Sequence, residues 1–369
     1  MRKTLTYLSI AYLSLLLLSC SSEEIISPVN ESLVEMPIAI DIVAKSQSQI
    51  ETRVITDEEI AGTCNVDIIK LLVYSATTQT DDRRTLTFHS EQELECKKEG
   101  GKWVARGSII GTAGNYYSIF ALGYSSAEAS SFEILPNPLQ KETTTYGNTK
   151  VSLKYTTLTG TLNSYNTPEF FAGSVIPKGE VNEIFQANDE VKLTGTLYRA
   201  VGKVQLSLTN IPASIKKVSL LSEKIAEYNI LYRISDAGSI ISQYPMGIPE
   251  ERELHKYVSE ITSVERLADT EWQASLSSFI IPLKESLLYV DATDNNDKTT
   301  RYLIKCADKM HNSIWIYVLG YGVKSYRFSI PPNYKVKIGG RFEQLKNSGN
   351  VLIDLSDIGE FEGGFLPEG

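Results

Sequence analysis

Histidines are the first side chains to consider for chemistry, because histidine is the commonest general base in enzymes. The chain has 369 residues and three histidines, His89, His255 and His311. None belongs to an H-E-x-x-H metal motif, and none accompanies a G-x-S-x-G nucleophile elbow. Each is flanked by ordinary loop or helix residues. The histidines are therefore expected to be exposed or incidentally packed, and the sequence predicts a protein that is not an enzyme.

Glycine pairs and one acidic loop are the next candidates for binding chemistry. The pairs at 100–101, 339–340 and 363–364 lack both the G-x-G-x-x-G spacing and a lysine-serine partner, so they predict turns. The loop Asp291–Asp297 offers enough oxygen donors for calcium, which takes about six to eight. It lacks the glycine and terminal glutamate of an EF-hand loop, and Asp and Asn are also typical of tight turns. We expect a hairpin turn there, with calcium as the alternative, and no metal or cofactor elsewhere.

Cys20 has the clearest predicted chemistry. Arg2 and Lys3 precede an almost uncharged, leucine-rich run, Leu5–Leu18, which is the pattern of a signal peptide. The run is shorter than the roughly 20 residues that cross a hydrocarbon core. Leu17–Cys20 resembles a lipobox, in which the cysteine thiol accepts diacylglycerol before cleavage. We predict a signal peptide over residues 1–19 and lipid on Cys20, with an ordinary signal peptide and a chance cysteine as the alternative.

A polar segment follows Cys20. Residues 20–35 are polar and lack strong periodicity, so they predict a flexible lipidated tether. The run Ser21–Glu24 looks like the surface-export signal of lipoproteins in the Bacteroides phylum, which would place the protein on the outer face of the cell outer membrane. A solvated tether without an export role is the alternative.

The charge balance and the remaining cysteines limit the possible partners. The sequence has 36 basic and 45 acidic side chains, and loss of Arg2 and Lys3 with the signal leaves a net charge of about −11. Nothing would neutralise phosphate, so no nucleic-acid partner is expected. Outside the cytoplasm a disulfide is allowed, and Cys64 with Cys96 is a better pairing than either with Cys306. No C-x-x-C pair is present, so a zinc site is not expected.

The elements that would position these residues are predicted to be strands. Short runs rich in Val, Ile, Thr and Tyr alternate with Gly, Pro, Asn and Asp clusters, as in an all-β protein. In Lys203–Leu208 apolar and polar residues alternate, so one face would meet a core and the other water. The clearest expected strands are Ile38–Val43, Ile68–Tyr74, Tyr116–Leu122, Val151–Tyr155, Val191–Tyr198, Val201–Leu208, Lys217–Leu221, Ile280–Val290, Thr300–Ile304, Ile314–Leu319 and Tyr334–Ile338.

One helix and one domain boundary are also expected. Apolar residues in Pro249–Ala268 follow helical spacing behind a proline suited to a first turn, so a short helical insertion is predicted there. The regular run from Leu197 follows a loop-rich stretch, Phe170–Asn188. We therefore expect an N-terminal β-sandwich over residues 36–195 and a C-terminal β-sandwich over residues 196–369.

Four segments follow one another in an informative order. They are the aliphatic run Ile68–Tyr74, the aromatic strand after a glycine in Gly114–Leu122, the phenylalanine-rich turn Phe170–Gly173 and the arginine-to-lysine run Leu197–Val204. Together they resemble the fimbrillin family, the shaft, tip and anchor subunits of type V pili in the Bacteroides phylum. The resemblance implies two tandem transthyretin-like β-sandwich domains, export as a lipoprotein, and assembly with other fimbrial subunits into a surface fimbria for adhesion to a host or bacterial receptor.

Strand exchange is the activity that the resemblance implies. In shaft subunits of this family an arginine-specific protease removes the amino-terminal strand, and a strand from a neighbouring subunit fills the groove. Here Met36–Val43 has the length and alternation to pair with a sheet edge, so its loss would leave unpaired backbone groups beside an apolar groove. Arg53 lies after a polar stretch and is the expected cut site, which would make Val54 the new amino terminus and remove lipidated Cys20. An uncut loop arginine is the alternative.

The donor strand and the position in the fimbria stay open at this stage. Asn350–Ile358 alternates as a groove-filling strand should, and its alternative is the last strand of its own domain. The insertion Pro249–Ala268 and the cysteines depart from a plain shaft subunit, so shaft, tip and anchor are all possible. A surface glycan-binding lipoprotein is the rival function, for which Trp103, Trp272 and Trp315 are the first stacking candidates.

Overall fold

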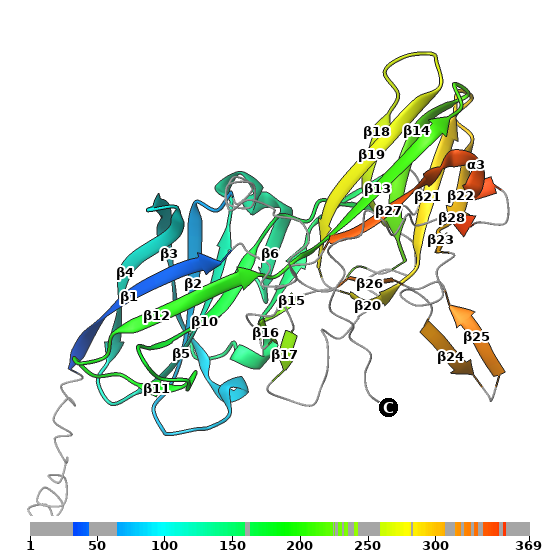
Figure 1. The fold of residues 1–369 in the computed structure, drawn as a ribbon. Coiled ribbons are helices and arrows are strands. Elements are labelled where there is room, and N and C mark those ends of the chain that lie inside the picture. The colour runs from blue at the N-terminus through cyan, green and yellow to red at the C-terminus, as the bar shows by residue number, and fades with distance from the viewer. Residues whose placement is uncertain are drawn as a thin grey trace, which may run out of the picture.

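The computed structural model describes most of the chain between residues 32 and 351. The described residues are 32–43, 65–158, 163–223, 225, 228–230, 232–234, 240–242, 259–281, 283–306, 314–318, 321–325, 328–330, 335–346 and 350–351. Strands predominate among them (Figure 1), which confirms the predicted β-rich fold. No helix among the described residues is long and apolar enough to cross a membrane.

The strands and helices lie as follows. The first half contains β1 (Leu33–Val43), β2 (Ile68–Ala76), β3 (Thr87–Glu99), β4 (Lys102–Thr112), β5 (Tyr116–Tyr124), β6 (Phe132–Leu135), β7 (Lys150–Leu153), β8 (Tyr155–Thr157), β9 (Asn163–Tyr165), β10 (Phe171–Pro177), β11 (Phe185–Gln186) and β12 (Leu193–Arg199), with 3-10 turns η1 (Arg83–Thr85), η2 (Ser126–Ser131) and η3 (Tyr146–Asn148). The second half contains β13 (Gly202–Ile211), β14 (Ile215–Ser222), β15 (Tyr228–Asn229), β16 (Tyr232–Ile234), β17 (Ile240–Ser242), β18 (Ser259–Glu265), β19 (Trp272–Ile280), β20 (Leu283–Ser286), β21 (Leu288–Asp294), β22 (Thr299–Leu303), β23 (Lys305–Cys306), β24 (Ile314–Val318), β25 (Tyr321–Ser325), β26 (Phe328–Ile330), β27 (Lys335–Arg341), helix α3 (Phe342–Lys346) and β28 (Asn350–Val351).

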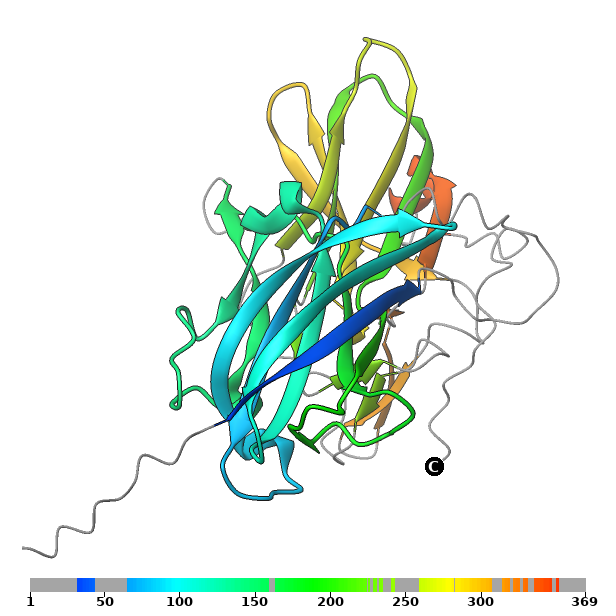
Figure 2. The same ribbon diagram turned by 90° about the vertical axis from the view of Figure 1, so that its left-hand side faces the viewer.

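The first sheet closes on itself. Its strands run in the order β10-β12-β1-β4-β3-β2-β5-β11, and β10 also pairs with β5. Seven strands therefore form a ring, with β11 attached to the start of β5. The long strands of this sheet are strongly bent in the side view (Figure 2). Closure leaves β1 with a bonded neighbour on each side, so its backbone is not an exposed edge.

Two strands of this sheet, β2 and β5, are buried on both faces. In β2, Leu71 and Val73 face the interior of the closed sheet, whereas Leu72 and Tyr74 face a second core outside it. The Tyr74 hydroxyl donates a hydrogen bond to Thr149 Oγ1 at 2.7 Å, which ties β2 to the small sheet β15-β7-β6 and to η3. Burial on both faces explains why the sequence of β2 is continuously apolar rather than alternating.

The second half forms two further sheets. One has the order β19-β13-β27, and the other has the order β22-β21-β14-β18-β9-β8. The hairpin β8–β9 precedes β12 in the chain but joins the second of these sheets, through the pair Ser164 and Glu260. The core between the two sheets contains residues such as Leu206 and Leu220 and is continuous with the outer core of β2 and β5.

The helix predicted over Pro249–Ala268 is wrong over its second half. Ser259–Glu265 form β18, which pairs antiparallel with β14. The β-branched residues of this stretch, Ile261, Thr262 and Val264, favour an extended backbone, and pairing with β14 outweighed the helical spacing. Residues 249–258 lie outside the described residues. The turn predicted at Phe170–Gly173 is also wrong, because β10 begins at Phe171.

The expected domain boundary falls inside a strand. β12 spans Leu193–Arg199 and pairs with β1 and β10 in the first sheet, so the sheets change only at β13, after residue 200. The division into two domains and their transthyretin-like character stay predictions.

Candidate functional site

The amino-terminal strand β1 lies between two strands that are distant from it in sequence. It pairs antiparallel with β4 from Leu33 to Ile42 and parallel with β12 from Ile38 to Val43. Pro37, which has no backbone N–H to donate, comes just before the pairing with β12 begins, so it does not interrupt that ladder. β1 therefore joins β4 directly to β12, and without it the ring of the first sheet would be open at this point.

The side chains of β1 alternate strictly between the core and solvent. Met36, Ile38, Ile40 and Ile42 are at most 6% exposed and belong to the core inside the closed sheet. The residues between them face outward. At about 1.5–3 kcal/mol for each fully buried aliphatic side chain, these four contribute roughly 6–12 kcal/mol of burial free energy. Loss of β1 would expose an apolar groove of the same length.

Two glycines on the neighbouring strands make room for these side chains. Gly195 of β12 stands opposite Ile40, and Gly111 of β4 lies close to Met36. A Cβ on Gly195 would lie 3.4 Å from Ile40 Cγ1 and 3.1 Å from Val175 Cγ2, which is closer than ordinary packing. A Cβ on Gly111 would similarly lie 3.0 Å from Met36 Cε. The groove is therefore shaped to hold large aliphatic side chains at fixed positions along its length.

The connection after β1 includes the expected processing site. β1 ends at Val43 and β2 begins at Ile68, so Arg53 and Val54 belong to the segment that joins them. Both residues, like Cys20, lie outside the described residues, and their roles stay predictions. The topology has one direct consequence: a single cut at Arg53 would leave β1 attached to the rest of the protein by non-covalent contacts alone.

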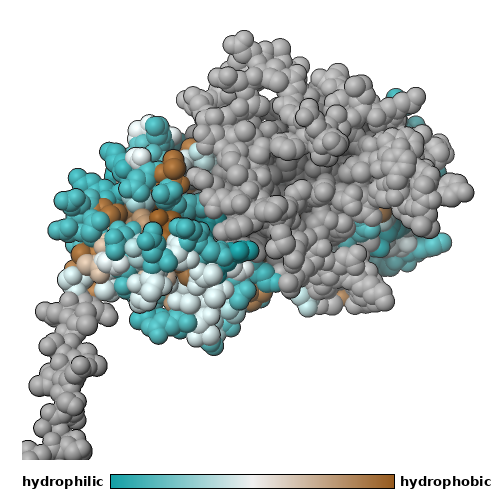
Figure 3. All heavy atoms as spheres, turned by 90° about the horizontal axis from the view of Figure 1, so that it is seen from below, coloured by the Kyte–Doolittle hydropathy of each residue, from teal (hydrophilic) through white to brown (hydrophobic). Residues whose placement is uncertain are grey.

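The described surface of the first half is mainly polar in one view. Seen from below, teal and white areas predominate on the described surface of the first half, with smaller apolar areas among them (Figure 3). Leu33 and Ile110, on β1 and β4, are exposed large hydrophobic residues of this sheet. The contrast between the two faces of β1 fixes its register, because a shift by one residue would turn its aliphatic side chains outward.

The residues considered for other chemistry have structural roles where they are described. His89 is half-buried with its ring edge-on to Tyr117 at 5.5 Å, and burial lowers its pKa. The loop expected as a hairpin turn is one, between β21 and β22: Asp294 Oδ1 accepts hydrogen bonds from the Asn296 and Lys298 backbone N–H groups at 2.8 and 2.9 Å. No group of metal-ligating side chains occurs among the described residues. His255 and His311 lie outside them.

The two tryptophans whose side chains are described do not form a shared stacking platform. Trp103 packs against the core inside the closed sheet, and Trp272 packs against the second core and donates to the Ile215 carbonyl at 3.0 Å. The side chain of Trp315 lies outside the described part of the chain. Both described tryptophans are partly buried, and they pack against different cores.

The position of Cys96 is compatible with the predicted disulfide between Cys64 and Cys96. Cys96 is buried on β3, and its backbone N–H donates to the Asp67 carbonyl at 2.8 Å, three residues along the chain from Cys64. Cys64 lies outside the described residues, so the disulfide stays a prediction.

A buried polar cluster at one end of the first sheet was not foreseen from the sequence. Arg83, the first residue of η1, contacts Glu183 at 2.5 Å, and both side chains are 3% exposed. Ser174 Oγ donates to Glu183 Oε1 at 2.6 Å and accepts from Arg83 Nη1 at 3.3 Å. A sequence signal was absent because the pair joins two loops, before β3 and before β11, whose proximity depends on closure of the sheet.

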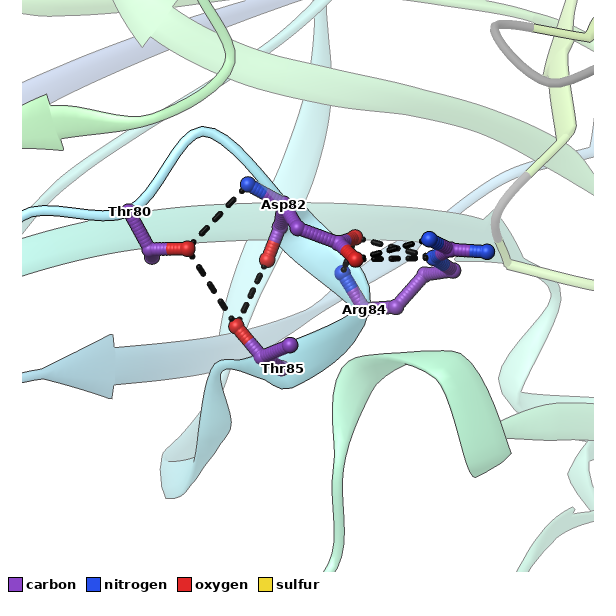
Figure 4. Close-up of polar contacts among 4 residues, drawn as sticks. All are labelled: Thr80, Asp82, Arg84 and Thr85. Atoms are coloured by element: carbon purple, nitrogen blue, oxygen red, sulfur yellow. Dashed lines mark hydrogen bonds and ion pairs between the residues drawn. The ribbon is translucent and has the colours of Figure 1, made fainter.

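The turn that holds Arg83 is itself rigidly bonded. Asp82 caps η1, accepting from the Arg84 backbone N–H at 3.0 Å and from the Arg84 guanidinium at 2.8–3.1 Å (Figure 4). Thr80 Oγ1 accepts from the Asp82 backbone N–H at 3.1 Å, and Thr85 Oγ1 donates to the Asp82 carbonyl at 2.8 Å. These bonds stabilise the loop between β2 and β3 in one conformation.

Comparison with solved structures finds fimbrial proteins and adhesins. A candidate adhesin from Bacteroides ovatus is 9% identical with a TM-score of 0.44, over 88% of this chain and 93% of that one. The fimbrial anchor protein Mfa2 from Porphyromonas gingivalis is 11% identical with a TM-score of 0.39, over 72% and 81%. The tip fimbrial protein Mfa3 from the same organism, truncated at its carboxy terminus, is 12% identical with a TM-score of 0.31, over 83% and 94%.

Comparison of the sequence itself finds neither a matching family model nor a matching curated protein.

Proposed function

We propose that this chain is a non-enzymatic structural subunit of a cell-surface fimbria, assembled by exchange of its amino-terminal strand and serving adhesion. The observation that carries the proposal is β1 itself. It is a terminal strand with four side chains buried in a groove between β4 and β12, and a cut after it would detach it without breaking any other element.

Exchange is favourable because the groove cannot remain empty in water. Without β1, the facing backbone groups of β4 and β12 lose their partners, and the aliphatic lining is exposed. A strand from another subunit restores the hydrogen-bond ladder and the burial together. The incoming strand must run antiparallel to β4 and parallel to β12, and it must carry aliphatic side chains at alternate positions.

A segment near the carboxy terminus has the required pattern. Val351-Leu352-Ile353-Asp354-Leu355 matches Ile38-Ala39-Ile40-Asp41-Ile42 of β1, with aliphatic residues at three alternate positions and aspartate at the same place. In β1 the three isoleucines are buried and Asp41 is exposed. The segment beginning at Val351 of one subunit would therefore fill the groove of the next subunit in the register of β1.

The same segment also bonds within its own chain. Among the described residues, Asn350 and Val351 pair with Lys305 and Cys306 as β28 and β23. This pairing would have to separate for the segment to act as a donor strand, and burial of a full groove-filling strand in the next subunit would compensate for its loss.

Processing at Arg53 would decide the position of the subunit. A cut before Val54 releases β1 together with lipidated Cys20 and opens the groove, which converts an outer-membrane precursor into a polymerised subunit. An uncut chain keeps its lipid and its own β1, as an anchor in the outer membrane would. The mass of the amino-terminal peptide of the protein on cells distinguishes the two cases, because the mature chain begins either at lipidated Cys20 or at Val54.

The assembly experiment starts from the purified chain without its signal peptide. Treatment with an arginine-specific protease should produce a ladder that resists SDS, with Val54 at the new amino terminus. Arg53→Ala should prevent the ladder and keep β1 in place. Deletion of residues 350–369, or the double substitution Ile353→Asp and Leu355→Asp, should allow cleavage but not polymerisation. Ladders that persist in the deletion variant would overturn the proposal.

A further inference from the structure

A small pocket opens at the end of the first sheet where β5 begins. It has a volume of about 300 Å³ and is lined by the loop Gln79–Arg83 after β2, the loop Val181–Ile184 before β11, and Tyr116 of β5. This volume is at the lower end of the range for small-molecule sites, about 300–1,000 Å³. No residue of β1 lines the pocket, so it is separate from the strand-exchange groove.

The floor of the pocket is preformed. Arg83 and Glu183 form the buried ion pair described above, and Ser174 bonds to both. The Arg83 guanidinium also lies 4.6 Å from the centroid of the Tyr146 ring, beneath the loop. Together with the bonds that fix the loop around Asp82, these contacts hold both walls in place without a ligand. A site that is already organised loses little conformational entropy on binding.

The rim supplies two amide groups and one carboxylate as hydrogen-bonding groups. The side chains of Gln79, Asp81 and Asn182 line the pocket and are exposed. They offer both donors and acceptors, because an amide has each kind and a carboxylate accepts. Tyr116 adds a half-buried aromatic ring. Adjacent hydroxyl groups on a rigid ring match such a set, while the ring's C–H face packs on an aromatic side chain.

Charge excludes the main competing ligand classes. Arg83 is neutralised by Glu183, and Asp81 leaves the pocket with a negative balance, which disfavours phosphate or carboxylate ligands. No cluster of three metal-ligating side chains is present in the described chain, which disfavours a divalent cation. We infer that this pocket binds one neutral sugar unit of a glycan, with Asp81 and Asn182 as the hydrogen-bonding residues and Tyr116 as the packing surface.

The test uses the mature chain and simple sugars. Methyl α- and β-glycosides of glucose, galactose, mannose and N-acetylglucosamine are each examined by saturation-transfer-difference NMR. At least one should receive saturation from the protein. Asp81→Ala and Asn182→Ala should each weaken its binding about tenfold, which corresponds to loss of hydrogen bonds worth about 1.4 kcal/mol. Asp189→Ala, an exposed carboxylate in the turn before β12, is the matched control and should leave binding unchanged.

A second variant fills the pocket without removing a polar group. Val181 is 77% exposed at the rim, so Val181→Trp should fold normally, as near-UV circular dichroism would verify, and should abolish saturation transfer. The inference is overturned if every glycoside gives no signal with the wild-type chain, or if the filled and wild-type pockets give equal signals. Cleavage at Arg53 removes no pocket residue, so binding should persist in cleaved protein whether or not that protein polymerises.

Discussion

The two terminal segments of the described chain, β1 and β28, are held very differently. β1 pairs on both sides, over ten residues with β4 and six with β12, and buries four aliphatic side chains. β28 pairs with β23 over two residues in the described part of the chain. The groove therefore belongs to the amino-terminal half and is firmly occupied by β1.

This difference gives exchange a direction. A strand bound as tightly as β1 does not leave at a useful rate while it is covalently connected, because detachment exposes its whole apolar face. The proposed exchange requires that the carboxy-terminal segment leave its own chain more easily than β1 does. Proteolysis would supply the step that the fold resists, and the carboxy-terminal segment would supply the free strand. Substitutions that weaken one end and not the other test this asymmetry.

The largest effect is expected from a charge on the inner face of β1. Ile40→Asp would place a carboxylate in the core at a fully buried position, and the free energy of unfolding should fall by about 5 kcal/mol, as urea denaturation would measure. Ala39→Asp adds the same group one residue earlier on the outer face, and should change stability by less than about 0.5 kcal/mol. An equal decrease in the free energy of unfolding in the two variants would show that β1 does not bind in this register.

A cavity on the same face should have the next largest effect. Met36→Ala removes a fully buried side chain, so stability should fall by about 3 kcal/mol in urea denaturation. Val351→Ala, in β28, should cost less than about 1 kcal/mol because a segment that exchanges between subunits contributes little to the stability of its own subunit. A loss at Val351 as large as that at Met36 would contradict the asymmetry between the two ends.

The sequence predicted the positions of individual strands but not the pairing between strands that are far apart in the chain. Alternation in Ile38–Val43 located the core of β1, and the apolar runs located β2 and β5, because these patterns depend on neighbouring residues. The parallel pairing of β1 with β12 and the closure of β5 on β10 join segments far apart in the chain and leave no local signal.

The errors have the same origin. The helical spacing around β18 does not reveal that β14 supplies the hydrogen bonds of this stretch. The sequence predicted the occupant of the groove, β1, and the strand of one wall, β12, but not the pairing of β1 with β4 and β12. The pocket near Arg83 and Glu183 could not be foreseen, since it exists only where two loops meet at the end of the closed sheet.

The packing of β10 against β12, the strand that forms one wall of the groove, should tolerate an added methyl group less well than the second half of the molecule. A Cβ on Gly173 of β10 would collide with the Thr196 carbonyl oxygen of β12, which is backbone and cannot rotate away. Gly173→Ala should therefore reduce stability by about 2 kcal/mol. Gly339→Ala in β27 is the control, because the nearest atom to its Cβ, the Ser207 carbonyl oxygen, lies 4.0 Å away. Thermal unfolding of both variants would measure the difference, and equal melting temperatures would contradict it.

The smallest expected effect concerns the junction between the closed sheet and the second core. Burial raises the pKa of Tyr146 to about 12, and its hydroxyl donates to the Ile230 carbonyl at 3.3 Å. The folded state thus holds this proton more tightly than the unfolded chain, whose tyrosine pKa is about 10. The resulting stabilisation is fully present below pH 10 and is lost as the pH rises from 10 to 12, at up to about 1.4 kcal/mol per pH unit.

Tyr146→Phe removes that titration along with one hydrogen bond. The variant should be about 1 kcal/mol less stable at neutral pH and should show a shallower decline of unfolding free energy above pH 10 than the wild-type chain. Urea denaturation at intervals from pH 8 to pH 12 would measure both slopes. Tyr146 packs against Tyr74 of β2, with ring centroids 4.8 Å apart. The variant therefore also tests how far the stability of the first sheet depends on its packing against η3. Parallel curves for the two proteins would place the alkaline loss of stability at other tyrosines.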